Sequence, residues 1–306
     1  MNFSAKQLSR IRTLKLLCVS ILFPTLFATA SLYALRWFEY AITFQPDPYK
    51  AGQTWTIPTG AEDVSFLNQN GQRLDGWFIP SQSGPALATI IFFHGQGGNV
   101  SNVAFIGEGL ASRGFDVLLF DYRGYGRSEG EITDEGDMYA DADAAYDYVV
   151  NQRGASAERV VLYGHSLGTA AVVDLASRRK CGAIILESGL SSASDMASIR
   201  LPWLPAWLRT LGRNRFDSVD KLPAASCPVL VTHGEPDNVV PTEQGRALYA
   251  AAHEPKKLII FKGADHGVSS YSGDYYFAQI TDFIEASLNI GPSTNLHNVA
   301  LASNRQ

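Results

Sequence analysis

A single serine stands between two glycines in the stretch GHSLG, residues 164–168. The residues before it, 160–163, are β-branched and apolar, which is typical of a buried strand, whereas the residues after it suit a helix. A serine at such a strand-to-helix turn is exposed, and its hydroxyl can attack a carbonyl carbon when a base removes its proton. Ser166 is therefore a candidate nucleophile.

The base that such a serine needs must itself be oriented by an acid. The segment FKGADHG places His266 on a glycine-flanked loop after the last apolar run, whereas the other five histidines lie in other motifs, at a strand end, on a helix or in the tail. Two carboxylates, Glu235 and Asp237, follow the preceding apolar run in THGEPDNVVP. These residues predict His266 as the base and leave both acids open.

Acyl transfer also requires hydrogen-bond donors for the oxyanion of the tetrahedral intermediate. The N–H of Leu167 follows the serine directly, at the start of the helix, where main-chain N–H groups are free. A glycine-rich loop, HGQGGNVS (94–101), follows another strand, but no lysine or Ser/Thr stands at the spacing of a phosphate-binding loop. A nucleotide site is therefore not expected.

The elements that must position these residues alternate along the chain. Short apolar runs begin near residues 88, 115, 159, 183, 228 and 257, and helical patterns cover 99–113, 134–152, 167–179, 242–253 and 274–288. A hairpin pattern centred on Asn70-Gly71 precedes them. The order predicts an α/β fold, with a mostly parallel, doubly wound sheet and an antiparallel hairpin at its N-terminal edge.

The GHSLG turn, with a strand before it and a helix after it, resembles the nucleophile elbow of the α/β-hydrolases, and residues 62–289 are similar to that family. The resemblance implies Asp237 as the acid. Glu187, which ends the run AIILES, is the alternative, because some members carry the acid one strand earlier. The HGQGG loop resembles the family's oxyanion loop, which implies the N–H of Gln96 as the second donor beside Leu167. The segment FDYRGYGRSEG (120–130) resembles one that supports this loop, which implies structural roles for Asp121 and Arg123.

Among α/β-hydrolases the chain is most similar to small, single-pass membrane-anchored serine hydrolases. This resemblance implies cleavage of an ester or thioester through an acyl-serine intermediate, without a metal or organic cofactor. The substrate is expected to be a small-molecule or acyl-protein ester. A peptidase or amidase with the same residues, or an exported binding protein of the same fold without turnover, are the alternatives.

A short insertion, residues 189–226, stands where α/β-hydrolases carry a cap. Its sequence IRLPWLPAWLRTLGRNRF predicts one apolar helical face, formed by Leu201, Leu204, Trp207, Leu208 and Leu211. One interpretation is a lid helix that packs on its own core. In the other, Trp203, Leu204, Trp207 and Leu208 line an acyl pocket or contact lipid.

The N-terminus carries four basic residues, Lys6, Arg10, Arg12 and Lys15, before an uncharged apolar stretch that ends at Arg36. We expect a basic cytoplasmic segment at 1–15, a transmembrane anchor at 16–36, a connector at 37–61, the hydrolase domain at 62–290 and a disordered tail at 291–306. The alternative is a signal peptide cleaved after the Ala-Thr-Ala of residues 28–30. Either way the catalytic domain is expected outside the cytoplasm, as a secreted or periplasmic protein if the segment is cleaved.

Composition narrows the possible partners. The net charge of −5 and the pI near 5.7 provide no broad basic field, so a nucleic-acid partner is not expected. Cys181 and Cys227 each stand just before a predicted strand, and these strands are expected to be neighbours. The pair is therefore either a disulfide in an oxidising compartment or two buried thiols.

Overall fold

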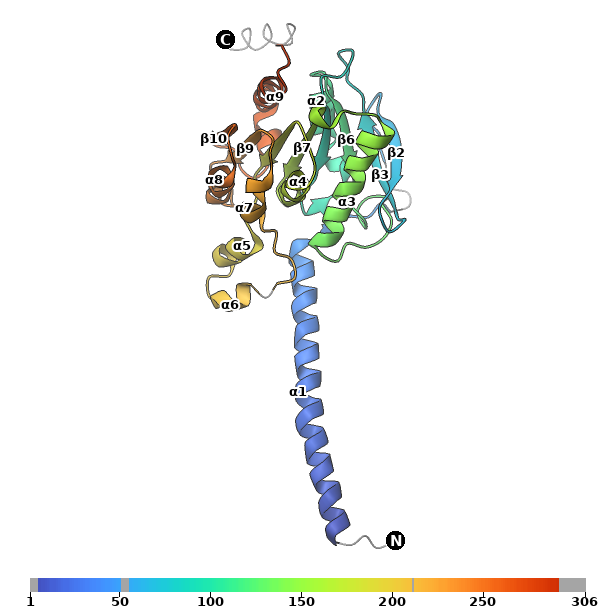
Figure 1. Ribbon diagram of the computed structural model, residues 1–306, viewed down its shortest axis with the longest axis vertical. Helices are drawn as coiled ribbons and strands as arrows, with labels where there is room; N and C mark the ends of the chain where they lie inside the picture. The colour runs from blue at the N-terminus through green and yellow to red at the C-terminus, as the bar shows by residue number, and fades with distance from the viewer. Residues whose placement is uncertain (1–4, 51–54, 211, 292–306) are drawn as a thin grey trace. The chain divides into compact units, whose positions relative to one another are not determined.

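The structure, a computed structural model, describes residues 5–50, 55–210 and 212–291, with side chains from residue 20 onwards. The chain divides between Thr43 and Phe44 into two compact units, of which the second holds the sheet (Figure 1). Apart from Gly291, the predicted tail lies outside the described residues.

The second unit is built on an eight-stranded sheet with the order β10-β9-β8-β7-β4-β6-β3-β2. Strands β2 and β3 form an antiparallel hairpin, β3 is also antiparallel to β6, and the other pairs are parallel. The fold class predicted from the sequence is thus confirmed. The strands are β2 Glu62–Leu67, β3 Arg73–Ile79, β4 Thr89–Phe93, β6 Asp116–Phe120, β7 Val160–His165, β8 Ala183–Glu187, β9 Val229–Gly234 and β10 Lys256–Phe261.

Helices cover both faces of this sheet (Figure 1). Helices α2 and α9 contact each other, while α3 contacts α4 and α7 contacts both α4 and α8. Under α2 and α9, alternate strand residues such as Ile90, Phe92 and Leu119 join Leu110 and Ile280 in a buried core. The helices are α2 Ala104–Ala111, α3 Glu135–Asp147, α4 Gly168–Ala176, α7 Ser218–Lys221, α8 Thr242–Ala251 and α9 Val268–Ser287. Short helical turns add η1 Val100–Asn102, the π-turn η2 Tyr148–Gln152, η3 Ala157–Arg159 and η4 Leu222–Ala224.

Helix α9 begins at Val268, six residues before the predicted start at 274. Gly273 joins two helical pieces there through a non-helical conformation, with φ 48° and ψ −127°. The early turn lies directly after His266, so the base candidate stands at the entrance of a helix.

The cap differs from its prediction. Two short helices, α5 Ala193–Arg200 and α6 Ala206–Arg209, replace the single helical face that the sequence pattern indicated. Pro202 and Pro205 explain the break, because proline lacks an N–H and disfavours helix in the residue before it. Leu201, Leu204 and Leu208 are half-buried, whereas Trp207 is 66% exposed, so of the predicted face Trp207 does not pack on the core. Trp203, which the predicted face does not include, is 75% exposed. Leu211 lies outside the described residues.

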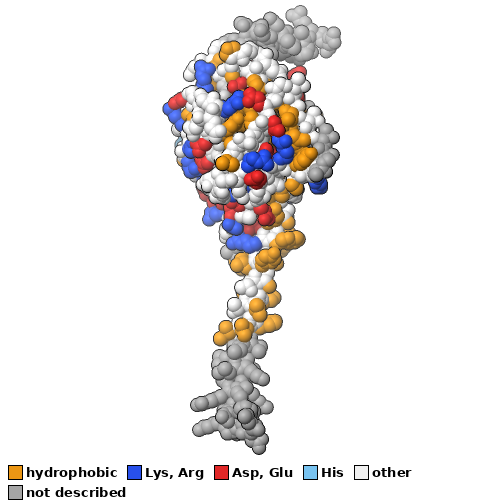
Figure 2. Space-filling view, turned by 90° about the vertical axis from the view of Figure 1, so that its right-hand side faces the viewer, with side chains coloured by type: hydrophobic (Ala, Val, Ile, Leu, Met, Phe, Trp, Pro, Cys, Tyr) orange, Lys and Arg blue, Asp and Glu red, His pale blue; other side chains and the backbone are white. Residues whose placement is uncertain are grey.

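The first unit contains helix α1, Ala5–Thr43. Its part from Ser20 to Thr43 is long and apolar enough to cross a membrane, and a signal sequence would satisfy the same criterion. Hydrophobic side chains such as Ile21 and Phe23 are exposed along it (Figure 2). The helix continues past residue 36, where the predicted span ends, to Thr43.

Cys181 and Cys227 precede β8 and β9, which are neighbours as predicted. Both thiols are buried and free, and their sulfur atoms lie 3.0 Å apart. The disulfide stays a prediction.

Candidate active site

Ser166 occupies a strained turn between β7, which ends at His165, and α4, which begins at Gly168. Its φ of 54° lies in the left-handed region that non-glycine residues rarely adopt. The N–H of Ser166 donates to the carbonyl of Glu187 at 2.8 Å, and its own carbonyl accepts from the hydroxyl of Thr169 at 2.7 Å. These bonds hold the strained conformation.

The glycines on each side of Ser166 are required by close backbone approaches. A β-carbon at Gly168 would lie 2.1 Å from the carbonyl oxygen of Phe93, and one at Gly164 would lie 2.7 Å from the carbonyl oxygen of Gly168. Both contacts are shorter than van der Waals separation, so a side chain at either position would force the turn open. The close packing of the main chain therefore explains why glycine stands two residues before and two residues after Ser166.

A chain of hydrogen bonds connects Ser166 to His266 and Asp237. The Oγ of Ser166 lies 2.9 Å from Nε2 of His266, and Nδ1 of His266 lies 2.8 Å from Oδ2 of Asp237. These residues come from the β7–α4 turn, the β10–α9 loop and the β9–α8 loop, so the carboxyl ends of three parallel strands bring them together.

Asp237 is held by several donors besides His266. Its Oδ1 accepts the N–H groups of Val239 and Val240, each at 2.8 Å, and Nε2 of His233 lies 3.2 Å from its Oδ2. Burial alone would raise the pKa of Asp237, but hydrogen bonds from His233 and His266 hold it well below its usual range. The carboxylate thus stays ionised beside His266. The sequence reasoning missed His233, although its spacing four residues before Asp237 is a signal that could have found it.

The alternative acid, Glu187, is bonded elsewhere. Its Oε1 accepts the N–H of Ser269 at 2.7 Å, and its Oε2 accepts the hydroxyl of Tyr163. The side chain is fully buried. The structure therefore places Asp237, and not Glu187, against His266. Glu235, the other carboxylate considered, is exposed on the β9–α8 loop.

The glycine-rich loop after β4 runs beside the serine. A β-carbon at Gly95 would lie 3.3 Å from Cβ of Ser166, so the main chain just before Gln96 passes directly over the nucleophile candidate. Leu167, the other predicted donor, is the N-cap residue of α4. The two predicted N–H donors therefore lie close to Ser166. Leu167 follows Ser166 in the chain, and Gln96 follows Gly95, which approaches the Ser166 side chain.

Buried polar residues contact the glycine-rich loop after β4 and hold its main chain. The N–H of Val100 donates to Oδ1 of Asp121 at 2.8 Å, and Nε2 of His94 lies 3.6 Å from the same oxygen. The Nδ1 of His94 donates to the carbonyl of Gly95 at 2.8 Å, which fits a neutral ring because burial lowers the pKa of His94 to about 4. Arg123 instead binds Asp141 at 2.7 Å, away from the serine.

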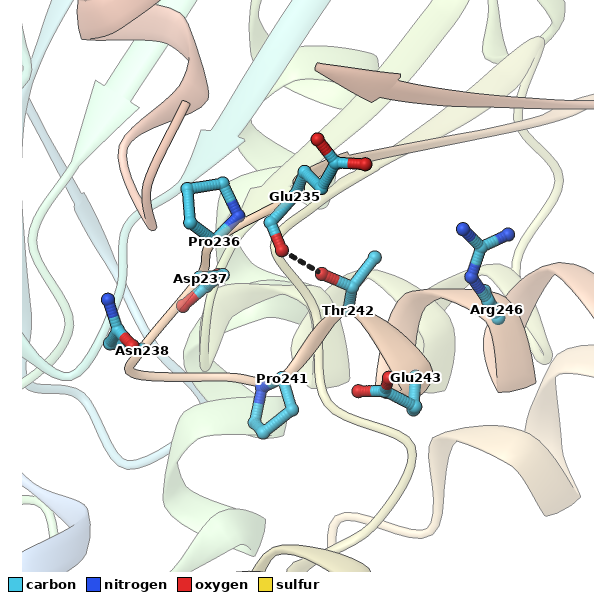
Figure 3. A pocket seen from close by; sticks show the side chains of 8 residues that line it. All are labelled: Glu235, Pro236, Asp237, Asn238, Pro241, Thr242, Glu243 and Arg246. Carbon is cyan, nitrogen blue, oxygen red and sulfur yellow. Dashed lines mark hydrogen bonds between the residues drawn. The ribbon is translucent and has the colours of Figure 1, made fainter. Parts of the chain in front are cut away.

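A pocket of about 320 Å³ lies on the outer side of the Asp237 loop (Figure 3). Its wall is mostly polar, and the hydroxyl of Thr242 donates to the carbonyl of Glu235 across it. None of the four predicted pocket residues of the cap lines it. The residues that line it are Glu235, Pro236, Asp237, Asn238, Pro241, Thr242, Glu243 and Arg246.

Comparison with known proteins places this geometry in context. A sequence profile described as "alpha/beta hydrolase fold" matches residues 88–219. The chain is 37% identical over 242 residues to YfhR of Escherichia coli K12, covering 76% of this chain and 83% of YfhR. It is 35% identical over 202 residues to mouse alpha/beta hydrolase domain-containing protein 17C, covering 65% and 60%. The Pyrococcus furiosus esterase Pf2001 superposes with a TM-score of 0.65 at 19% identity, covering 80% of this chain and 98% of the esterase, and so supports the fold.

Proposed function

The chain belongs to the α/β-hydrolase superfamily, and from that premise we propose that it is a serine hydrolase cleaving carboxylic ester or thioester bonds. Ser166, His266 and Asp237 form its catalytic triad. The observation that carries the proposal is the unbroken chain of hydrogen bonds, 2.9 Å from Ser166 to His266 and 2.8 Å from His266 to Asp237.

The mechanism follows from this order of groups. His266 Nε2 accepts the hydroxyl proton of Ser166 as Oγ attacks the acyl carbon, and Asp237 stabilises the imidazolium that results. The N–H groups of Leu167 and Gln96 stabilise the oxyanion. His266 then protonates the leaving alcohol or thiol, which leaves an acyl-Ser166 ester. A water molecule, deprotonated by His266, hydrolyses that ester and regenerates the serine.

The acyl group of the substrate is proposed to contact the cap. Trp203 and Trp207 are exposed apolar side chains, and with the half-buried Leu204 and Leu208 they offer apolar surface to an acyl chain. A small-molecule ester or an acylated protein fits this arrangement, since both present an acyl chain.

We further propose that α1 is an uncleaved anchor. The span of 24 residues from Ser20 to Thr43 exceeds the ~20 residues that a bilayer core requires, and the basic residues before it favour a cytoplasmic N-terminus. The hydrolase domain then lies on the non-cytoplasmic side, with the cap at about 189–226 and the tail after residue 290.

Labelling with a fluorophosphonate probe tests the proposed nucleophile. We expect wild type to be labelled at Ser166 and Ser166→Ala to remain unlabelled, with kcat for a short acyl ester reduced by roughly 10³-fold or more in Ser166→Ala and His266→Ala. Peptide mapping identifies the labelled residue. Labelling of Ser166→Ala at the wild-type rate would show that another group is the nucleophile.

A further inference from the structure

The chain that follows helix α1 pairs directly with the glycine-rich loop beside Ser166. Strand β1, Gln45–Pro46, lies parallel to β5, Gly97–Gly98, with Gln45 opposite Gly97. The N–H of Gln45 donates to the carbonyl of Gln96 at 2.9 Å. A segment just before the predicted hydrolase domain is therefore bonded to the residue proposed as an oxyanion donor.

A second donor reaches the same carbonyl. The hydroxyl of Tyr125 donates to the carbonyl oxygen of Gln96 at 2.7 Å, and the Tyr125 side chain is only 1% exposed. Two hydrogen bonds from distant parts of the chain thus fix the direction of this carbonyl. The carbonyl of Gln96 lies in the peptide plane that it shares with Gly97, and the N–H of Gln96 lies in the preceding plane, which meets the first at the Cα atom of Gln96. Fixing the carbonyl therefore anchors one of these two planes and reduces the rotations by which the N–H can leave its position.

The rest of the segment is held as firmly. The carbonyl of Asp47 accepts the side-chain amide of Asn99 and the N–H of Gly126, each at 3.1 Å, and the N–H of Tyr49 donates to the carbonyl of Gly126 at 2.6 Å. At its start, Phe44 is 2% exposed and packs edge-on against Phe216, with ring centroids 6.3 Å apart. Residues 44–49, here called the clamp segment, are therefore fixed at both ends.

The loop requires such support because of its composition. Gly95, Gly97 and Gly98 lie within four residues, and Gly98 has a φ of 77°. Glycine loses more conformational entropy on ordering than any other residue, so a loop of this kind does not hold one geometry by itself. An oxyanion donor must nevertheless lie 2.7–3.1 Å from the developing charge.

We propose that the clamp segment is a positioning element of the active site, which holds the N–H of Gln96 for the oxyanion through the Gln45 N–H and Tyr125. This inference rests on the proposed function. It gives the residues directly after the apolar helix a part in catalysis besides their part in connecting the helix to the sheet.

The test compares full-length variants that differ at the donor atoms. Gln45→Pro removes the N–H that binds Gln96, whereas Gln45→Ala keeps it and is the matched reference. Tyr125→Phe removes the second donor while preserving the ring, and serves if Gln45→Pro is poorly folded. The measurements are kcat and KM on an acyl ester, and amide hydrogen exchange of the loop at residues 94–103.

We expect kcat of Gln45→Pro to fall at least about tenfold below that of Gln45→Ala with KM within about twofold, and loop exchange to be faster. Tyr125→Phe should change kcat in the same direction. Unchanged loop exchange in both donor variants would overturn the proposal whether or not the protein hydrolyses esters. Faster exchange with unchanged kcat, in a protein that Ser166→Ala inactivates, would overturn the catalytic role of the clamp. Activity that survives Ser166→Ala would instead contradict the proposed function, and loop exchange would still report on the clamp.

Discussion

At the scale of single residues, two buried carboxylates near the site differ in their hydrogen-bond partners. Asp237 faces His266 and also accepts main-chain N–H groups, which favour its ionised form. Glu187 instead binds the N–H of Ser269, the second residue of α9, whose N-cap residue Gly267 provides no side-chain hydrogen bond. A buried carboxylate therefore binds the imidazole of His266 at one position and the start of a helix at the other.

Substitution of the two carboxylates tests this separation. Asp237→Asn should lower kcat by about 10³- to 10⁴-fold, because His266 loses the acceptor that fixes its tautomer and stabilises its charge. Glu187→Gln, a substitution of equal size, should retain a much larger fraction of kcat. Steady-state kinetics on an acyl ester measure both. If Glu187→Gln were the more damaging change, the acid would have to be assigned to β8.

The buried His94 predicts how stability depends on pH. Burial lowers its pKa from 6.5 to about 4, so between these values the unfolded chain binds a proton that the folded protein does not. Stability should therefore be full above pH 6.5 and fall as the pH drops, by up to about 1.4 kcal/mol per pH unit from this group.

Urea unfolding at pH 7.5 and pH 5.0 measures the effect. His94→Gln should lose less free energy of unfolding between these two pH values than wild type does, even if it is less stable at both. Equal losses in the two proteins would show that His94 does not carry this proton.

At the scale of elements, the parallel strands bring the loops that carry Ser166, Asp237 and His266 together. The loops after β7, β9 and β10 meet at one edge of the sheet, and the elbow glycines allow α4 to approach β4. The cap is different, because Pro202 and Pro205 limit the length of its helices, and Trp203 and Trp207 are exposed there. An exposed apolar surface of this kind suits a ligand with an acyl chain.

Chain-length dependence tests the role of the cap. Each methylene that the cap buries contributes about 0.8 kcal/mol, so kcat/KM should rise about fourfold per carbon over short acyl esters and then decline. Trp207→Ala should flatten this rise and retain acetyl-ester hydrolysis. Tyr271→Ala, an aromatic with 64% exposure on α9, is the control and should keep the wild-type profile. A profile independent of chain length in wild type would exclude an acyl-binding cap.

At the scale of the whole molecule, no linker separates the apolar helix α1 from the unit that holds the sheet. The second unit starts at Phe44, directly after the last residue of α1, and its first residues are buried or paired. The sequence predicted a connector over residues 37–61. In the structure, helix α1 extends to Thr43, and residues 44–49 are hydrogen-bonded to the rest of the second unit.

Membrane extraction tests the proposed anchor. The hydrolase should stay with membranes after a carbonate wash, because a predominantly apolar helix of 24 residues does not leave the bilayer at high pH. Protease added on the non-cytoplasmic side should digest the catalytic unit, since the four N-terminal basic residues favour the cytoplasm. A soluble, active chain that begins at Ser31 would instead identify a cleaved signal peptide.

The sequence by itself determined the order of strands and helices and the nature of the turn at Ser166. These features depend on local periodicity and on glycines next to the serine, which a short window of residues contains. Only the tertiary structure decided which carboxylate meets His266, how the cap is broken, and that Gln45 binds the loop beside the serine. Each of these depends on contacts between segments far apart in the chain, as between Ser166 and His266, which are 100 residues apart. Local pattern cannot rank such contacts, because the free energy that selects them comes from packing and from satisfying buried polar groups across the whole fold.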